Sequence, residues 1–414
     1  MSILFKNLQT IVSKGLSGPT NFLFEDGELK AFVGDDFQSA GVVIDGSGMI
    51  LTKGWIDLRC GIGEPGLEYK ETIESLAASL QSSGFTAAVL LPNTHPTIQS
   101  KGDIEYILNR AKRYTPEFII QGAVTKDTNG EELTEILDMN FQSGVKIFGE
   151  GIKPLSNGDR FMKVNQYLQK FDGILFDHSY DPLLAIFGQM HEGERSTMLG
   201  MKGIPNLAED VAIQRNIEIL KYTGGRLHFQ TISSAKSIDL IRRAKAEGLK
   251  ITADISIYQL IFSDEDLMDF DPNLKVQPPY RGDTDRMALI EGLKDGTIDA
   301  IVSNHQPEDF DSKFMEFDLA HFGMAGLQTF LPALVKLEVE LGWELLITKI
   351  TDGPASIIPH QLQEAWTIFD PETAWNYNEK TNKSLSSNNP WFGKQLTGQI
   401  RYVIQKGQLI EVNV

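Results

Sequence analysis

The chain begins and ends in short apolar stretches that alternate with polar residues and are separated by turn residues. Alternation with a period of two is typical of half-buried strands, and an Asp-Gly pair between two such stretches favours a hairpin. Strands of this kind are expected at residues 3–6, 21–24, 29–33, 41–45, 365–369 and 398–407. Because chain ends often lie close together, we expect residues 1–53 and 360–414 to form one small β domain. Within it, residues 376–393 are rich in Asn, Ser and Lys and predict a loop.

The central part of the chain, residues 54–359, has a different pattern, in which short apolar stretches alternate with amphipathic segments. Eight of the apolar stretches are expected to be strands, and they begin near Trp55, Ala88, Phe118, Val145, Ile174, Leu227, Ile251 and Ala300. Segments between them carry apolar residues at the three-to-four spacing of a helix, as in 71–83, 208–222, 235–247 and 286–293. Eight strands that alternate with helices predict an α/β fold, the TIM (β/α)8 barrel.

The composition is that of an ordinary globular chain with an acidic surface. The 414 residues carry a net charge of −18, which disfavours binding to nucleic acid and to anionic membrane surfaces. The first residues lack the features of a signal peptide, and no apolar run approaches the roughly 18 residues of a membrane span, so we expect a cytoplasmic protein. Cys60 is the one cysteine, which excludes an internal disulfide, and its apolar strand favours a buried position.

The stretch from Gly54 to Gly66 joins the first barrel strand to a turn that is rich in Gly and Pro. Side chains alternate along a strand, so residues 57, 59 and 61 are expected on one face. Two imidazoles at this spacing could bind one metal ion. Here Arg59 is a permanent cation without a lone pair and Gly61 has no side chain, so this strand should repel Zn²⁺.

Several further motifs lie along the chain. They are Glu64-Pro65-Gly66, Leu91-Pro92-Asn93-Thr94, His191-Glu192-Gly193-Glu194, Thr223-Gly224-Gly225-Arg226-Leu227-His228 and Lys275-Val276-Gln277-Pro278-Pro279-Tyr280-Arg281, followed by the stretch from Asp295 to His305. On these motifs the chain resembles the bacterial, aspartate-transcarbamoylase-associated class of dihydroorotases, within the cyclic amidohydrolase superfamily. The resemblance covers nearly the whole chain, and it implies a barrel whose active members hold zinc.

The resemblance also implies six positions for metal binding or proton transfer in active members. These are two His of the first strand, an acidic residue or carboxylated Lys after the fourth, a His after the fifth, a His after the sixth and an Asp after the eighth. In this chain they are Arg59, Gly61, Gly151, His178, Thr231 and Asn304. Only His178 is retained, so we expect a degenerate site with no catalytic residues and no bound zinc. Asn304 matters most, because an amide lacks the basicity of the family Asp, which serves both as ligand and as base.

The positions that the resemblance implies for substrate binding are altered as well. Gly63 stands for an Arg that would grip a carboxylate with two hydrogen bonds, and Gln277 stands for an Asn. Asn93 and His305 are retained as vestigial substrate-binding residues. Recognition of dihydroorotate should therefore be weak.

Lys146 offers an alternative ligand, since under a shifted alignment it resembles the carboxylated lysine of another dihydroorotase class. Lys146 and His178 together would still supply only two ligands, whereas a catalytic zinc site needs at least about three. We favour the interpretation that Lys146 is a strand lysine paired with a neighbouring carboxylate.

Arg59 is expected to occupy the place of the missing metal. Without the ions, acidic groups such as Asp57, Glu150 and Asp254 would repel each other, and a guanidinium can donate up to about five hydrogen bonds. We expect it to pair with one or two of these carboxylates; the alternative is a guanidinium that reaches into solvent.

Three functions remain open on the sequence. The first is a catalytically inactive dihydroorotase-like protein that acts as a structural or regulatory partner in pyrimidine biosynthesis, with aspartate transcarbamoylase as the partner that the resemblance implies and with a possible homo-oligomer. The second is an active cyclic amide hydrolase, dihydroorotase- or hydantoinase-like, with an altered metal site. The third is a sensor that binds a small pyrimidine precursor in the old pocket without turning it over.

Overall fold

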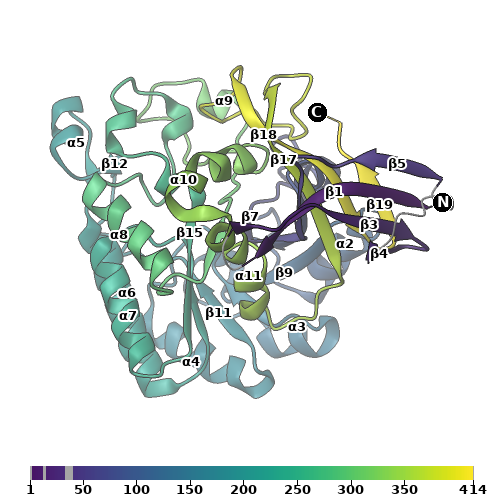
Figure 1. Cartoon of the computed structure of the whole chain (residues 1–414). Coiled ribbons are helices and arrows are strands. Elements are labelled where there is room, and N and C mark those ends of the chain that lie inside the picture. The colour runs from purple at the N-terminus through teal and green to yellow at the C-terminus, as the bar shows by residue number, and fades with distance from the viewer. Residues whose placement is uncertain (1, 13–14, 33–40, 414) are drawn as a thin grey trace.

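The structure, a computed structural model, describes residues 2–12, 15–32 and 41–413 (Figure 1). It consists of an eight-stranded barrel and a nine-stranded sheet whose strands come from both chain ends. The predicted fold class, an α/β TIM barrel with a small β domain, is confirmed. Within the described residues, no helix is both long and apolar enough to span a membrane.

The barrel strands are all parallel and follow one another in chain order. They are β7 (Trp55–Cys60), β8 (Phe85–Leu90), β9 (Glu117–Ala123), β10 (Ile147–Gly149), β11 (Ile174–Asp177), β14 (Leu227–Phe229), β15 (Ile251–Ser256) and β16 (Ala300–Val302). Each predicted strand is present, and a bridge between Cys60 and His305 connects the last strand to the first. The short strands β12 (Met190–His191) and β13 (Gly203–Ile204) pair in a loop outside the barrel.

Helices surround the barrel, and the four helical segments singled out in the sequence are present as α1, α6, α7 and α8. The helices are α1 (Ile73–Ser82), α2 (Lys101–Ala111), α3 (Ile136–Ser143), α4 (Gly158–Leu168), α5 (Glu194–Leu199), α6 (Asn206–Thr223), α7 (Ala235–Ala246), α8 (Asp283–Lys294), α9 (Phe310–Lys313), α10 (Phe330–Thr348) and α11 (Asp352–Ile357). Local chemistry sets their ends. Helix α1, for example, begins after Thr72, whose hydroxyl accepts the Ser75 N–H at 3.1 Å and satisfies one of the free donors of the first turn.

Alternating residues of the strands build two separate apolar layers. One layer fills the barrel interior with Ile56, Leu58, Ala87, Val89, Ile147, Ile174, Phe176, Ala300 and Val302, and Ile357 and Ile358 pack against it. The intervening residues, among them Trp55, Ala88 and Leu90, belong to the larger layer that packs beneath the helices. The barrel is thus a packed core, which leaves its strand ends as the place for chemistry.

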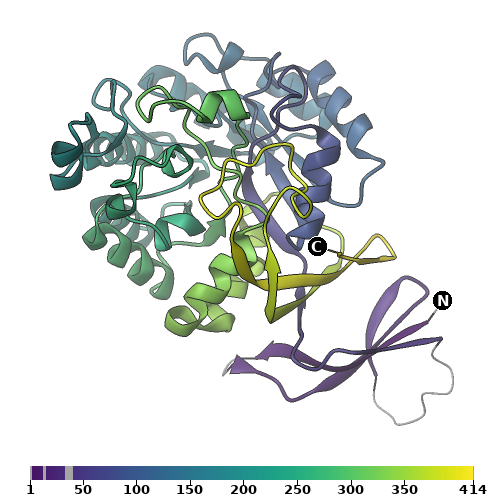
Figure 2. The same cartoon turned by 90° about the horizontal axis from the view of Figure 1, so that it is seen from above.

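The small sheet lies beside the barrel, with the C-terminal strands between the barrel and the N-terminal strands (Figure 2). Its strands are β1 (Ile3–Val12), β2 (Gly15–Leu16), β3 (Thr20–Glu25), β4 (Glu28–Phe32), β5 (Val42–Asp45), β6 (Ile50–Lys53), β17 (Ala365–Asn376), β18 (Gln395–Gln405) and β19 (Gln408–Glu411). The strand expected at 29–33 is β4; its last predicted residue, Val33, lies outside the described residues. The strands confirm the predicted sheet, and 1–53 with 360–414 and 54–359 remain our proposed domain boundaries.

A cluster of aromatic side chains joins the sheet to the barrel. The Trp55 ring lies 5.9 Å from the Phe85 ring and 5.5 Å from the Phe369 ring of β17, and the Phe85 ring lies 4.9 Å from that of Phe330 in α10. All four side chains are fully buried. Such contacts contribute roughly 0.5–1.5 kcal/mol per pair beyond the burial of area, so they hold the two parts in a fixed relation.

The connection between β17 and β18, residues 377–394, is the predicted loop, and it extends to the mouth of the barrel. Its Asn389 side chain donates to the Ala325 carbonyl at 2.9 Å, and its Ser384 hydroxyl donates to the buried Glu71 carboxylate. The C-terminal part of the chain therefore helps to build the loops that surround the candidate site.

Candidate functional site

The six positions that the sequence analysis singled out converge at the carboxyl ends of the barrel strands. Arg59 and Gly61 lie at the end of β7, Gly151 follows β10, His178 follows β11, Thr231 follows β14, and Asn304 follows β16. Asn93 follows β8, and His305 follows Asn304. Parallel strands of a barrel bring these ends together, and the hydrogen bonds described below connect many of them.

Arg59 is fully buried at the centre of this group. Its Nε donates to Asn304 Oδ1 at 2.9 Å, and its Nη1 donates to the Gly151 carbonyl at 3.1 Å and to Gln230 Oε1 at 2.9 Å. Burial lowers the pKa of Arg59 to about 10, so the guanidinium stays charged at neutral pH. Arg59 is thus buried among the strand-end residues, and its occupation of a former metal site stays a prediction.

The predicted pairing of Arg59 with carboxylates is wrong, and so is the solvent-exposed alternative. All three of its side-chain partners are neutral oxygens, and no carboxylate of the described residues lies within 4 Å of the guanidinium. Asp254 illustrates the reason, because its two oxygens already accept from His228 Nε2 at 2.8 Å and from the Thr231 N–H at 2.6 Å. A carboxylate that is satisfied locally has no need of a second cationic partner.

Asp57 and Glu150 are also held by neutral donors. Asp57 accepts from the Ser303 N–H and the Arg59 N–H, both at 3.2 Å, and from the Ser303 hydroxyl. Glu150 accepts from the Thr125 N–H at 2.8 Å and from its hydroxyl at 2.6 Å. Burial raises the pKa of Asp57 to about 6 and that of Glu150 to about 7. Hydrogen bonds from neutral donors therefore satisfy the two acids that were expected to repel each other.

His178, the one retained ligand position, is buried beside Arg59. Its Nδ1 lies 3.0 Å from the Thr231 hydroxyl, and its Nε2 has no hydrogen-bond partner among the described residues. Burial, together with the positive charge of Arg59, lowers the pKa of His178 well below its usual value. The imidazole is therefore neutral at pH 7.

Neither Gly61 nor Gly63 has room for a side chain. A Cβ at Gly61 would lie 2.8 Å from the His305 carbonyl oxygen, which accepts the Gly61 N–H at 2.7 Å. A Cβ at Gly63 would lie 2.2 Å from the Leu67 carbonyl oxygen and 2.5 Å from that of Glu71. These neighbours are backbone atoms, which cannot rotate away. The backbone as arranged here leaves no space for the His and the Arg that the resemblance implies at these two positions.

Gly151 and the side chain of Asn93 lie in close contact. Gly151 has a φ of +65°, and a Cβ there would lie 1.8 Å from Asn93 Oδ1. The Asn93 side chain accepts the Ile152 N–H at 2.8 Å and donates to the Glu150 carbonyl at 3.0 Å. Asn93 is thus engaged with the backbone of the loop after β10, and an acidic residue at 151 would displace it.

His305 and Asn304 lie on opposite sides of the loop after β16. His305 is buried, accepts the Gly326 N–H through Nδ1 at 3.2 Å, and places Nε2 3.4 Å from a Glu71 oxygen. Asn304 has a φ of +47° and donates through Nδ2 to the Gln277 carbonyl at 3.3 Å. His305 is therefore committed to structural contacts, whereas Asn304 contacts Arg59 directly.

Sequence reasoning missed Gln230 and Ser303, which hold Arg59 and Asp57 in place. Each precedes a position that was singled out, Thr231 and Asn304 respectively, at the end of a barrel strand. Both have ordinary polar side chains. Their position at the end of a strand is therefore the one feature of the sequence that could have pointed to them.

A small cavity of about 320 Å³ opens above this cluster. Arg59, His178 and Gln277 line it, together with Lys153 and Tyr180 from the loops after β10 and β11. The remaining wall is mostly apolar and includes Ile152, Pro182, Ala185, Ile204 and Phe322. The barrel mouth has thus kept a pocket of the size that holds a small molecule.

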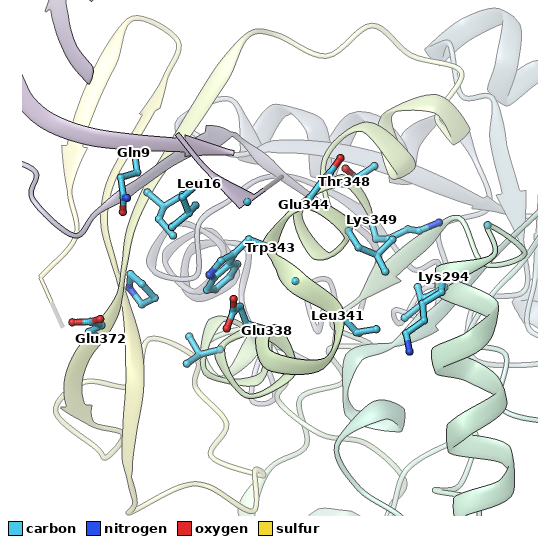
Figure 3. A pocket seen from close by; sticks show the side chains of 18 of the residues that line it. Gln9, Leu16, Lys294, Glu338, Leu341, Trp343, Glu344, Thr348, Lys349 and Glu372 are labelled. Atoms are coloured by element: carbon cyan, nitrogen blue, oxygen red, sulfur yellow. The ribbon is translucent and has the colours of Figure 1, made fainter. Parts of the chain in front are cut away.

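A larger groove of about 1020 Å³ lies elsewhere, between the small sheet and helix α10 (Figure 3). Gln9 and Leu16 line one side, and Glu338, Trp343 and Lys349 line the other. It contains none of the positions singled out in the sequence. The chemistry that the sequence points to belongs to the smaller pocket.

Comparison with known proteins identifies the family of this chain. A family model described as "Dihydro-orotase-like" matches residues 48–237. A dihydroorotase of Caldanaerobacter subterraneus subsp. tengcongensis is 35% identical over 99% of this chain and 97% of its own length, and one of Ruminiclostridium cellulolyticum is 36% identical over 98% of each chain. The chain belongs to the dihydroorotase family.

Solved structures support the fold of this family member. An L-hydantoinase (dihydropyrimidinase) from Arthrobacter aurescens superposes with a TM-score of 0.84 at 21% identity and covers 99% of this chain and 96% of that chain. A dihydropyrimidinase from Brevibacillus agri superposes with a TM-score of 0.79 at 16% identity over 100% of this chain and 95% of that chain. Both carry the barrel with its β domain in the same arrangement.

The residues of this dihydroorotase-family site do not fit the zinc centre that the resemblance implies. Among the described residues, no group of three or more His, Cys, Asp or Glu is placed to hold a metal ion. The buried cation of Arg59 lies beside His178, so an added divalent cation would meet repulsion as well as a shortage of ligands.

Lys146 does not supply an additional metal ligand. It is exposed at the amino end of β10, whereas His178 follows the carboxyl end of β11, so the two residues lie at opposite ends of parallel strands. The shifted alignment that would make Lys146 a carboxylated ligand is wrong for this reason. Its expected pairing is wrong as well, since Lys146 forms no ion pair with a carboxylate in the described part of the chain.

Proposed function

We propose that this dihydroorotase-family protein lacks the hydrolase chemistry of the family and serves as a structural or regulatory partner in pyrimidine biosynthesis, in the cytoplasm. The observation that carries the proposal is the position of Arg59. Its charged guanidinium is buried at the first metal-ligand position and held by three neutral oxygens. A permanent cation there replaces an ion-binding group by one that repels ions.

Proton transfer is impaired by the same replacements. The family base is Asn304 here, and its Oδ1 accepts hydrogen bonds from Arg59 at 2.9 Å and from Gln306 at 3.0 Å. An amide that is engaged in this way cannot accept a proton from water. His178 is neutral but faces no other base, so no relay from an attacking water to a leaving nitrogen can be drawn from these residues.

The experiment measures zinc and turnover in one preparation. We expect elemental analysis of purified protein to find far less than one zinc per chain, and we expect no interconversion of dihydroorotate and carbamoyl aspartate. A related active dihydroorotase, purified in the same way, is the control. Stoichiometric zinc, together with turnover that a chelator abolishes, would refute the proposal.

Aspartate transcarbamoylase is the proposed partner, and a homo-oligomer is a second possible assembly. Exposed aromatic residues near the barrel mouth support a protein contact. Phe310 of α9 and Phe314, which directly follows this helix, are 67% and 77% exposed, and their rings stack at 4.7 Å. Exposed apolar surface of this kind often marks an interaction site.

The partner can be tested by co-purification with the aspartate transcarbamoylase of the same source. We expect a complex in size-exclusion chromatography with light scattering, and we expect Phe314→Ser to weaken it. The control is Val339→Ser, which removes a 91% exposed apolar side chain on α10. Equal effects of the two substitutions, or the absence of any complex, would exclude this surface.

An active cyclic amide hydrolase with an altered metal site is the alternative function. It would require a metal bound by His178 and few other protein ligands. A titration with Zn²⁺, Mn²⁺ and Co²⁺ followed by assays with dihydroorotate and hydantoin would reveal it through saturable, metal-dependent turnover.

A further inference from the structure

Two neighbouring loops at the carboxyl ends of the barrel strands carry exposed apolar side chains among acidic ones. Residues 264–275 follow β15, and residues 308–319 follow β16 and include α9. We call these two segments the acidic–aromatic face. Six apolar side chains of the face are exposed: Met268, Phe270, Phe310, Phe314, Met315 and Leu319. Exposed apolar side chains that gather on one surface indicate a contact with another molecule.

Two buried lysines hold the segments of the face together. Lys313 Nζ donates to the carbonyl oxygens of Pro272 at 2.8 Å and of Lys275 at 3.2 Å. Lys275 Nζ in turn donates to the Phe317 carbonyl oxygen at 2.8 Å. Both lysines are buried, and the Phe270 ring lies 6.2 Å from the Phe317 ring. Because these contacts cross from one segment to the other, the two segments form one preformed surface.

The charge of the face is strongly negative. Each segment contains five acidic residues, and the basic residues of the face are the two buried lysines, which donate to backbone carbonyl oxygens. Two of the ten acids pair with residues outside the face, Glu265 with Arg195 at 2.6 Å and Glu308 with Lys70 at 2.7 Å. The other eight acids form no ion pair within the described part of the chain. The exposed apolar side chains are therefore surrounded by unneutralised carboxylates.

This combination of charge and apolar surface decides the kind of partner. Nucleic acid and anionic membranes would be repelled. A second copy of the chain would be repelled as well, because its net charge is −18 and a symmetric contact would place the same acids opposite each other. A basic protein segment fits both features. Its Lys and Arg side chains pair with carboxylates, and they also bind over exposed aromatic rings such as the stacked pair of Phe310 and Phe314.

We propose that the acidic–aromatic face binds a segment of a partner protein in which Lys or Arg side chains flank apolar ones. The apolar residues of that segment pack on Phe310, Phe314 and Leu319, and its basic residues lie over the surrounding carboxylates. The inference rests on the partner role proposed above and adds the chemistry of the segment that makes the contact. Binding must then depend on salt, because the screening length falls from about 10 Å at about 0.1 M salt to about 3 Å at about 1 M.

Two probes test the inference with the full chain. One is the aspartate transcarbamoylase of the same source, and the other is a helical peptide with Lys on one side and Leu on the other. A peptide with Glu in place of Lys is the control. Fluorescence anisotropy at about 0.1 M and about 1 M salt should show the Lys peptide binding about tenfold more weakly at the higher salt and the Glu peptide not binding at all. Equal binding of the two peptides would overturn the charge argument.

Charge reversal locates the contact. Asp269→Lys with Glu316→Lys makes one change in each segment, at exposed side chains that form no hydrogen bond or ion pair among the described residues. The matched control is Glu131→Lys with Glu340→Lys, which changes the net charge by the same amount at exposed residues outside the face. We expect the first variant to bind either probe about tenfold more weakly and the control to bind like the parent. Equal binding by the two variants would refute the site. Phe314→Ser tests the apolar part separately, and unchanged peptide binding by this variant would exclude the packing on the aromatic pair.

The outcomes separate this inference from the proposed function. Salt-dependent peptide binding that the charge reversal weakens, without binding of aspartate transcarbamoylase, would support the face and refute that partner. A complex with aspartate transcarbamoylase that neither salt nor the charge reversal weakens would refute the inference and leave the partner role intact. Absence of binding by both probes would refute the inference, and the zinc and turnover measurements would still decide whether the hydrolase chemistry is lacking.

Discussion

Gly61→Ala adds a single methyl group at the second ligand position, and its effect can be estimated from the backbone around it. The new Cβ would lie 2.8 Å from the His305 carbonyl oxygen and 3.5 Å from the Gln306 Cα. The carbonyl is fixed by the hydrogen bond that it accepts from the Gly61 N–H at 2.7 Å, so the barrel closure at β16 and β7 must shift. Overpacking of this kind costs about 1–3 kcal/mol.

The expected loss is measurable as a melting temperature. For domains of 150–250 residues, 1 kcal/mol corresponds to roughly 2–4 °C, so we expect Gly61→Ala to melt several degrees below the parent in scanning calorimetry. Gly102→Ala is the matched control, because its Cβ in α2 would meet nothing closer than Ser100 Oγ at 3.7 Å. Removal of a helical glycine should stabilise the protein by up to about 1 kcal/mol. If Gly61→Ala melts at or above the melting temperature of the parent, the backbone around residue 61 has room for a methyl group and the reasoning is wrong.

Two further predictions concern the same strand ends. The double variant Arg59→His with Gly61→His should show no hydrolysis of dihydroorotate in a zinc-supplemented assay. Asn304 still lacks basicity in this variant, and the new side chain at residue 61 collides with backbone atoms. Measurable turnover would contradict this prediction. Glu150→Gln should change the pH dependence of stability, because the pKa of Glu150 in the folded protein is about 7 and its usual value is 4.5. The stability that protonated Glu150 contributes is therefore complete below about pH 4 and is lost as the pH rises through about 7. Thermal melts between pH 4 and 8 should therefore decline less in the variant than in the parent, and identical pH profiles would contradict the assignment.

The fold could be predicted from the sequence because its signals are local and repeated. The eight barrel strands, from Trp55 to Ala300, are short and mainly apolar, as expected for parallel strands that are covered on both faces. The Asp-Gly turn at 26–27 separates β3 from β4, as expected for a hairpin. The boundaries shifted by up to three residues, as at β8, because pairing with neighbouring strands decides where a strand begins.

The sequence predicts which positions form the candidate site, but it does not predict the contacts between their side chains. The sequence put Arg59, His178 and Asn304 at strand ends, and the structure adds that Arg59 contacts Asn304 and that His178 contacts Thr231. It could not show that Asp254 is satisfied by His228, or that Gly61 and Gly63 have lost the space for a side chain. Such facts depend on distances between loops that are far apart in the sequence.

The buried charges of this barrel mouth are each stabilised by neutral groups. The buried acids are satisfied by hydroxyl, amide and imidazole donors, and burial raises the pKa values of Asp57 and Glu150 towards neutrality. Arg59 is satisfied by neutral acceptors in the same way. Among the described residues, no carboxylate lies within 4 Å of the Arg59 guanidinium. A buried Arg–carboxylate pair has to recover the desolvation cost of both ions from their mutual attraction, whereas here hydrogen bonds to neutral groups satisfy Arg59 and the acids separately.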